Sequence, residues 1–198
     1  MAVKLYYFPY SSFIMTIARL IEGCKKQDRS CQKTLYLQYV QLASRISLRY
    51  ARDEHEAKDI VQNAFVKVFT KIKSYKARKG TFESWLSRIV INEALQLYRK
   101  QQKYATWEAD FSEELEASPD ALDKLQAEDI LKLLRKLPDG YRLVFVLFVV
   151  EGYTHQEIAK ELGINTSTSR SQLTRAKKLL QKFITEQNSL EHAKDFTK

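Results

Sequence analysis

The chain has 198 residues, and 33 lysines and arginines against 24 aspartates and glutamates give a formal net charge of +9. A 44% share of hydrophobic residues excludes a disordered chain, and the length fits one domain or two small ones. Only five glycines and three prolines favour long helices over many short strands. The charge favours a polyanionic partner, nucleic acid ahead of a membrane surface, although a merely basic protein has the same balance.

The N-terminal stretch Leu5–Met15 is apolar and aromatic but too short to span a bilayer, and no small-residue cleavage site follows it. We expect residues 1–15 to be an extension outside the folded body, with Met1 and Met15 both possible starts. No other apolar run is long enough to cross a membrane, so no membrane insertion is expected. Cys24 and Cys31 form no CxxC pair, which predicts neither a disulfide nor a metal site.

Apolar residues at helical spacing predict four helices in the first part of the chain. Asp53, with Glu56 three residues later, has the spacing of a capping box. Gly80 breaks the chain, and Thr81 can cap the helix after it. The predicted helices are Thr16–Lys26, Ser30–Ala51, a third that buries residues between Ile60 and Phe69, and a fourth that carries Phe82 to Leu97.

The composition changes after Lys103, where an acidic stretch without a clean apolar period runs to Ser118-Pro119. We interpret residues 104–119 as a linker between two domains. Helical patterns then resume, and the polar tail from Thr185 is expected to fray. The predicted helices are Ala121–Leu137, a helix from Asp139 or Gly140 to Val150, Thr154–Leu162 and Thr166–Ile184.

The segment from Gly152 to Lys178 has the pattern of a helix-turn-helix. Thr154 and Glu157 form a second capping box, and Gly163 stands where a tight turn needs positive φ. Short polar side chains near the start of the last helix and cations further along suit a helix in a major groove. An ordinary amphipathic helix pair with a basic outer face is the alternative. The outward residues are Arg170, Ser171, Thr174, Arg175 and Lys178, opposite a core face of Ser169, Leu173, Ala176 and Leu180.

Cations alternate with aromatic residues in a second basic region, between Lys71 and Lys103. Such a surface suits a single nucleic-acid strand, because cations follow the backbone and aromatic rings stack on unpaired bases. Phe82 and Trp85 could equally be core residues.

These motifs occur in the order found in the extracytoplasmic-function class of bacterial RNA polymerase sigma factors, which the chain resembles from about Ile17 to Phe183. The resemblance rests on residues 57–69, 80–99 and 137–178. It implies an all-α fold of two small helical domains joined by a flexible acidic linker, the C-terminal one a helix-turn-helix. The implied divisions are 16–103 for core polymerase and the −10 element, 104–119 for the linker, 120–185 for the −35 element and 186–198 for a polar tail.

The resemblance also implies which residues act. Asp59 and Gln62 match the pair that meets the polymerase clamp, with Phe65 as an apolar companion. Gln96 stands where the family often has Asp or Asn, and Ser169 replaces a usual apolar residue. The residues implied for −10 DNA are Tyr75, Lys76, Arg88, Asn92, Gln96 and Arg99, and those for −35 DNA are Arg170, Ser171, Thr174, Arg175 and Lys178.

A sigma factor of this class directs promoter recognition, −10 melting and transcription initiation in the cytoplasm. Its expected partners are core RNA polymerase, promoter DNA and an anti-sigma factor, and no cofactor, metal or catalytic residue is expected. A helix-turn-helix regulator acting without polymerase would leave Asp59 and Gln62 unused. An enzyme is disfavoured because the three histidines lie far apart, without a nucleophile–base pattern. A basic membrane-surface protein has only the charge and the N-terminal stretch in its favour.

Overall fold

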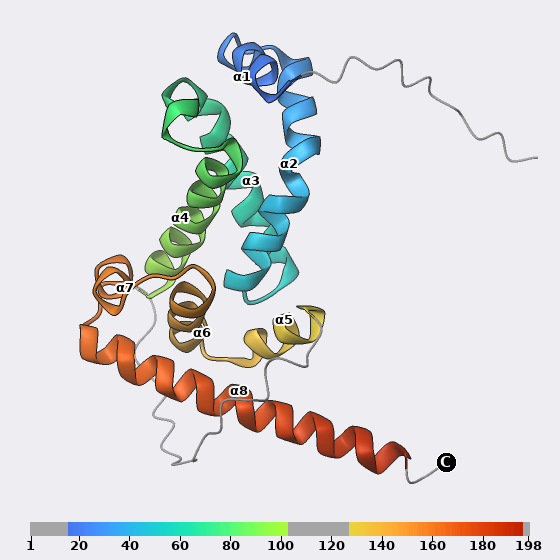
Figure 1. The fold of residues 1–198 in the computed structure, drawn as a ribbon, viewed down its shortest axis with the longest axis vertical. Helices are drawn as coiled ribbons and strands as arrows, with labels where there is room; N and C mark the ends of the chain where they lie inside the picture. The colour runs from blue at the N-terminus through green and yellow to red at the C-terminus, as the bar shows by residue number, and fades with distance from the viewer. Residues whose placement is uncertain (1–15, 103–126, 196–198) are drawn as a thin grey trace, which may run out of the picture.

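The computed structural model describes residues 16–102, here the first half, and residues 127–195, the second half. Every regular element in these two ranges is helical (Figure 1). The predicted extension 1–15 and acidic linker 104–119 lie outside the described residues. Within the described ranges, no helix is both long and apolar enough to cross a bilayer.

The first half contains four α-helices, as the sequence predicts. Two short 3-10 turns, η1 and η2, connect the third helix to the fourth. In order, the elements are α1 (Ile17–Lys25), α2 (Arg29–Tyr50), α3 (Glu54–Lys71), η1 (Ile72–Ser74), η2 (Ala77–Lys79) and α4 (Phe82–Gln102).

Side-chain caps fix where these helices begin. The Asp53 carboxylate accepts a hydrogen bond from the Glu56 amide at 2.8 Å, as its capping position predicts. Glu56 reaches back one residue further than in a capping box and accepts from the Arg52 amide at 2.6 Å, because the Arg52 guanidinium also holds it at 3.0 Å. Thr81 caps α4 through the Ser84 amide at 3.2 Å.

Helices α2, α3 and α4 pack side by side into a bundle, and α1 crosses its end (Figure 1). Leu35, Val68 and Leu86 are fully buried between them. Ala57 and Ala64 on α3 are also buried, and their small side chains let the helix backbones approach closely. These residues belong to an apolar cluster that also includes buried residues of the second half.

The second half contains α5 (Ala127–Lys136), α6 (Asp139–Phe145), the π-helical turn η4 (Val146–Val150), α7 (His155–Leu162) and α8 (Thr166–Asp195). The predicted single helix up to Val150 widens at Val146, where the Glu151 amide bonds the Val146 carbonyl at 3.1 Å. The prediction that the chain frays from Thr185 is wrong for the residues up to Asp195, because α8 continues to that residue. The tail is rich in good helix formers, which helps that continuation.

The two halves meet at the carboxyl end of α2. Arg142 of α6 is only 2% exposed, and its Nε donates to the Tyr50 carbonyl at 3.2 Å. The same guanidinium donates to the Leu137 carbonyl at 3.3 Å and to the Asp139 carboxylate at 2.8 Å. These bonds satisfy the buried cation, so its burial carries little penalty.

Candidate nucleic-acid and polymerase interfaces

Helix α4 presents a polar stripe to solvent. Arg88, Asn92, Gln96 and Arg99 are all exposed, and their spacing of four, four and three residues places them on one face of the helix. The structure thus brings together four of the six residues that the resemblance implies for −10 DNA. Two amides between two cations form a surface that can bond bases and phosphates.

Gln96 is held in place by α3. Lys67 donates from Nζ to Gln96 Oε1 at 2.8 Å, and the same ammonium forms an ion pair with Glu93, which is 8% exposed. The side chain of Asn92, one turn away, has no hydrogen bond to any described residue. The two amides of the stripe therefore differ, since one has a fixed orientation and the other can rotate.

The other two implied −10 residues lie in the turn between α3 and α4. Tyr75 donates from its hydroxyl to the Gly80 carbonyl at 3.1 Å, and its ring centroid lies 5.6 Å from that of Phe82. Phe82 is 2% exposed and is a core residue, whereas Trp85 is half-buried beside Tyr75. Tyr75 thus holds the turn in shape, while Lys76 is exposed and free to meet a phosphate.

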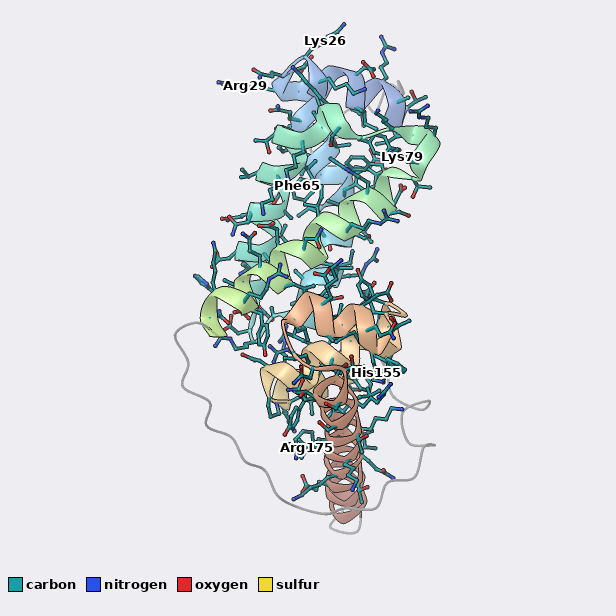
Figure 2. The ribbon with its side chains drawn as sticks, turned by 90° about the vertical axis from the view of Figure 1, so that its left-hand side faces the viewer. Lys26, Arg29, Phe65, Lys79, His155 and Arg175 are labelled. Atoms are coloured by element: carbon teal, nitrogen blue, oxygen red, sulfur yellow. The ribbon has the colours of Figure 1, made fainter. Side chains whose placement is uncertain are left out.

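The implied clamp residues divide into exposed and buried. Asp59 and Gln62 are exposed on α3, but Phe65 is 3% exposed and packs edge-on against Tyr36 of α2, with ring centroids 4.7 Å apart. Its burial agrees with the core face that the sequence predicts for this helix, and its role beside the clamp residues stays a prediction. Figure 2 shows Phe65 on α3, in the body of the first half.

A groove of about 470 Å³ lies between α2 and α3, and Gln62 is one of its lining residues. Leu37 and Val66, on the same two helices, are 60% and 63% exposed. Sequence reasoning missed both, although apolar residues off the core face of an amphipathic helix were the available signal. Neither residue lines the groove, but both add exposed apolar surface to α2 and α3.

The helix-turn-helix geometry is confirmed. Thr154 and Glu157 form a reciprocal capping box, with the Thr154 amide donating to Glu157 at 2.9 Å and the Glu157 amide to Thr154 Oγ1 at 3.3 Å. These hydrogen bonds lower the pKa of the Glu157 carboxyl. Gly163 has φ of 69°, the left-handed conformation predicted for the turn.

The start of α8 has the two faces that its sequence predicts. Ser169, Leu173, Ala176 and Leu180 are buried. Of the outward residues, Arg175 donates to the Tyr141 hydroxyl at 3.3 Å and so leans toward α6; Figure 2 shows it on α8. Arg170, Ser171, Thr174 and Arg175 are exposed, and Lys178 is half-buried.

Ser169 does not leave a loose contact in the core. His155 Nδ1 and Ser169 Oγ lie 2.9 Å apart, and the imidazole stacks on Phe148 with ring centroids 4.5 Å apart. The buried hydroxyl is thereby paired across α7 and α8. Burial lowers the pKa of His155, and the nearby charge of Arg170 lowers it further.

One residue of the α4 stripe contacts the helix-turn-helix. Arg99 Nη1 donates to the Glu161 carbonyl of α7 at 2.8 Å, and the Glu161 carboxylate lies 3.6 Å away. Arg99 therefore has a protein partner in this arrangement, and a DNA phosphate would compete with it.

Comparisons with known proteins give the two halves a family. A model described as sigma-70 region 2 matches residues 35–104, and one described as sigma-70, region 4 matches residues 127–180. The matches follow the family's order and together span more than half of the chain. The chain belongs to the sigma-70 family, in its extracytoplasmic-function class. It is thus a sigma factor, a protein that directs promoter-specific transcription initiation.

The relatives are distant but cover most of this sigma factor. It is 28% identical to the ECF RNA polymerase sigma factor SigE of Mycolicibacterium smegmatis, over 78% of its own length and 62% of the relative. It is also 28% identical to the ECF RNA polymerase sigma factor SigW of Bacillus subtilis, over 85% and 96% of the two chains. Among solved structures, the sigma factor RpoE in complex with the anti-sigma factor NepR from Bartonella quintana matches with a TM-score of 0.47 and 22% identity, over 77% of this chain and 96% of that one.

Proposed function

We propose that this sigma factor binds core RNA polymerase through the groove between α2 and α3, and reads the −10 and −35 elements of promoters with α4 and α8. The observation that carries the proposal is the ordered match to regions 2 and 4. The proposed role is that of a regulatory subunit and not an enzyme, acting in the cytoplasm where polymerase works.

The α4 stripe supports a role in −10 recognition. Arg88 and Arg99 would bind phosphates of the strand that separates from its partner, and Asn92 and Gln96 would bond unpaired bases. Lys76, exposed beside the aromatic residues that shape the turn, adds a cation at the end of this path. Figure 2 places the nearby Lys79 at the end of the molecule far from α8, so the basic surface continues past the stripe.

The start of α8 supports a role in −35 recognition. Arg170, Ser171 and Thr174 lie where a recognition helix enters the major groove, and Arg175 follows them by one residue. Arginine can bond guanine O6 and N7 together, whereas hydroxyls accept or donate to several bases. Lys178, one turn further, would bind a phosphate.

The α2–α3 face supports the proposed contact with polymerase. Leu37 and Val66 offer exposed apolar side chains on these two helices, and Asp59 and Gln62 offer exposed polar ones. An interface core of this kind excludes water, and a carboxylate with an amide can bond arginines of a partner helix. We propose that an anti-sigma factor competes for the same face.

The test is run-off transcription with bacterial core RNA polymerase on a pool of promoter fragments. We expect wild type to give transcripts from a small promoter set, and Asp59→Ala/Gln62→Ala to lose them. Gln38→Ala, exposed on α2 away from the groove, is the matched control and should keep them. Absence of transcripts, together with tight duplex binding by the protein alone, would instead establish a stand-alone helix-turn-helix regulator.

A further inference from the structure

Lys67 differs from an ordinary surface lysine because its ammonium contacts two side chains of a neighbouring helix. Its ammonium lies between a buried carboxylate, Glu93, and the amide oxygen of Gln96, and its side chain is only 37% exposed. Both partners are on α4, so this lysine of α3 ties the two helices together directly behind the polar stripe. Neither composition nor spacing indicates the arrangement, because 29 residues separate Lys67 from Gln96.

The chemistry of lysine fixes which way the amide points. An ammonium carries three N–H donors and no acceptor, so the Gln96 atom that faces Lys67 must be its oxygen. The Gln96 NH₂ group then points away from Lys67, and no described residue accepts a hydrogen bond from it. Glu93 balances the ammonium charge and holds Lys67 against α4.

An amide fixed in this way, with an ammonium beside its oxygen, is poorly matched to the two bonds that glutamine uses for adenine. Adenine offers N7 as acceptor and N6 as donor, and glutamine matches them with its nitrogen and its oxygen together. Lys67 already donates to Oε1, and its positive charge beside the second lone pair of that oxygen opposes a further donor such as adenine N6, so this surface presents mainly the donors of the Gln96 NH₂ group and of the Lys67 ammonium. Such a site fits a base edge that carries neighbouring acceptors, as guanine O6 and N7 do.

We propose that Lys67 is a positioning residue that fixes Gln96 as a hydrogen-bond donor and so makes one position of the −10 element select an acceptor-bearing base edge and reject adenine. The inference rests on the proposed function, because it needs the α4 stripe to meet promoter DNA. Asn92, whose amide has no partner among the described residues, can turn either way and imposes no such choice on its own base.

The experiment is transcription by core polymerase and this sigma factor from a promoter library randomised across the −10 element. Wild type should disfavour adenine at one position by roughly tenfold, the scale of a lost bidentate pair. Lys67→Met keeps the apolar stem and removes the donor, so adenine should rise by roughly tenfold at that position only. Lys67→Arg keeps a donor and should retain the wild-type preference.

Two further variants distinguish the effect of the Gln96 orientation from the effects of protein stability and of the lost Lys67 charge. Lys67→Met leaves Glu93 without its cation, so Lys67→Met/Glu93→Gln supplies a version without a buried unpaired carboxylate, and it should show the same adenine tolerance. Asn92→Ala should change preference at a different position.

An equal loss of transcripts for all four bases, steeper at high salt, would show that Lys67 merely binds a phosphate and would overturn the inference. An unchanged base preference in both methionine variants, with wild type active, would also overturn it. Absence of wild-type transcripts from every library member would overturn the proposed function, and this inference with it.

Discussion

The interior of each half is apolar, whereas the hydrogen bonds and ion pairs that join the halves come from arginines beside one continuous apolar cluster. Inside the first half, Leu35 and Leu86 are buried among other apolar side chains, and Leu147 is buried in the same way in the second. Between the halves, the bonds come from arginines: Arg142 to the Tyr50 carbonyl, and Arg99 to Glu161. Most of the apolar packing lies inside the two halves, whereas polar contacts between domains can exchange with water or with another partner. This difference predicts two folding units joined by a weaker contact.

The largest effects should come from the two cores. Leu35→Ala and Leu147→Ala each remove a side chain that is fully buried and should each lower the free energy of unfolding by about 3 kcal/mol. Hydrogen exchange resolved by peptide should rise first in the half that carries the substitution. Leu37→Ala, at a residue 60% exposed, is the control and should cost less than about 0.5 kcal/mol. Equal acceleration in both halves by either core variant would make the chain one cooperative unit.

Arg142→Ala should have the next largest effect. It removes three hydrogen bonds and leaves the Tyr50 and Leu137 carbonyls without this donor, which should cost about 2 kcal/mol. Urea unfolding measures the loss, and small-angle scattering should show a larger radius of gyration as the halves separate. Lys177→Ala, exposed on α8, should change neither quantity. A destabilised but equally compact variant would mean that other contacts hold the halves together.

Thr154→Ala should act inside the second half alone. It removes the side-chain acceptor for the Glu157 amide and the hydroxyl that bonds the Glu157 carboxylate at 2.8 Å, at a cost of about 1 kcal/mol. Amide exchange in α7 should accelerate, and exchange in α2 to α4 should stay as in wild type. Ser167→Ala, exposed in the first turn of α8, serves as the control. Faster exchange across the first half would contradict independent folding.

Arg99→Ala should barely change stability, because its pair with Glu161 leaves the two side chains 44% and 36% exposed. We expect a loss below about 1 kcal/mol but a wider distribution of distances between spin labels placed on α4 and α7. About 0.5 M salt should widen the wild-type distribution in the same direction, since exposed ion pairs are screened. Lys100→Ala, the exposed neighbour, should leave the distribution unchanged.

Local rules in the sequence predicted the helices and the helix-turn-helix because each rule acts within a few residues. The Thr154–Glu157 box, the left-handed Gly163 and the buried face that includes Leu173 are set by neighbours in the chain, and all three are confirmed. The same logic placed Arg88, Asn92 and Gln96 on one helix face. The burial of Phe65 was predicted in the same way, but spacing along a helix does not say that Tyr36 of α2 is the residue that covers it.

Contacts between distant residues could not be predicted in this way. Lys67 meets Gln96 across two helices, and Arg142 meets Tyr50 across 92 residues of chain. Ser169 replaces an apolar residue on the core face, and the sequence did not show that it pairs with His155, which lies on another helix. Such pairs depend on which helices pack against each other, and the spacing of residues in a single sequence does not indicate that.

The smallest predicted effect is a difference between the two halves in how their stability depends on pH. His155 prefers its neutral form when folded, because burial and then Arg170 lower its pKa. Its contribution to stability is therefore full above the unfolded pKa of about 6.5 and is lost as pH falls through the lower folded value.

In the first half, hydrogen bonds from the Glu56 and His55 amides lower the pKa of Asp53, so its contribution fades only below about pH 4. Peptide-resolved hydrogen exchange, corrected for the intrinsic rate, should show α7 and α8 loosening as pH falls below about 6.5, while α2 to α4 do not change until near pH 4. His155→Gln, which can still bond Ser169 without titrating, should remove that difference, and its persistence in the variant would assign it to another group.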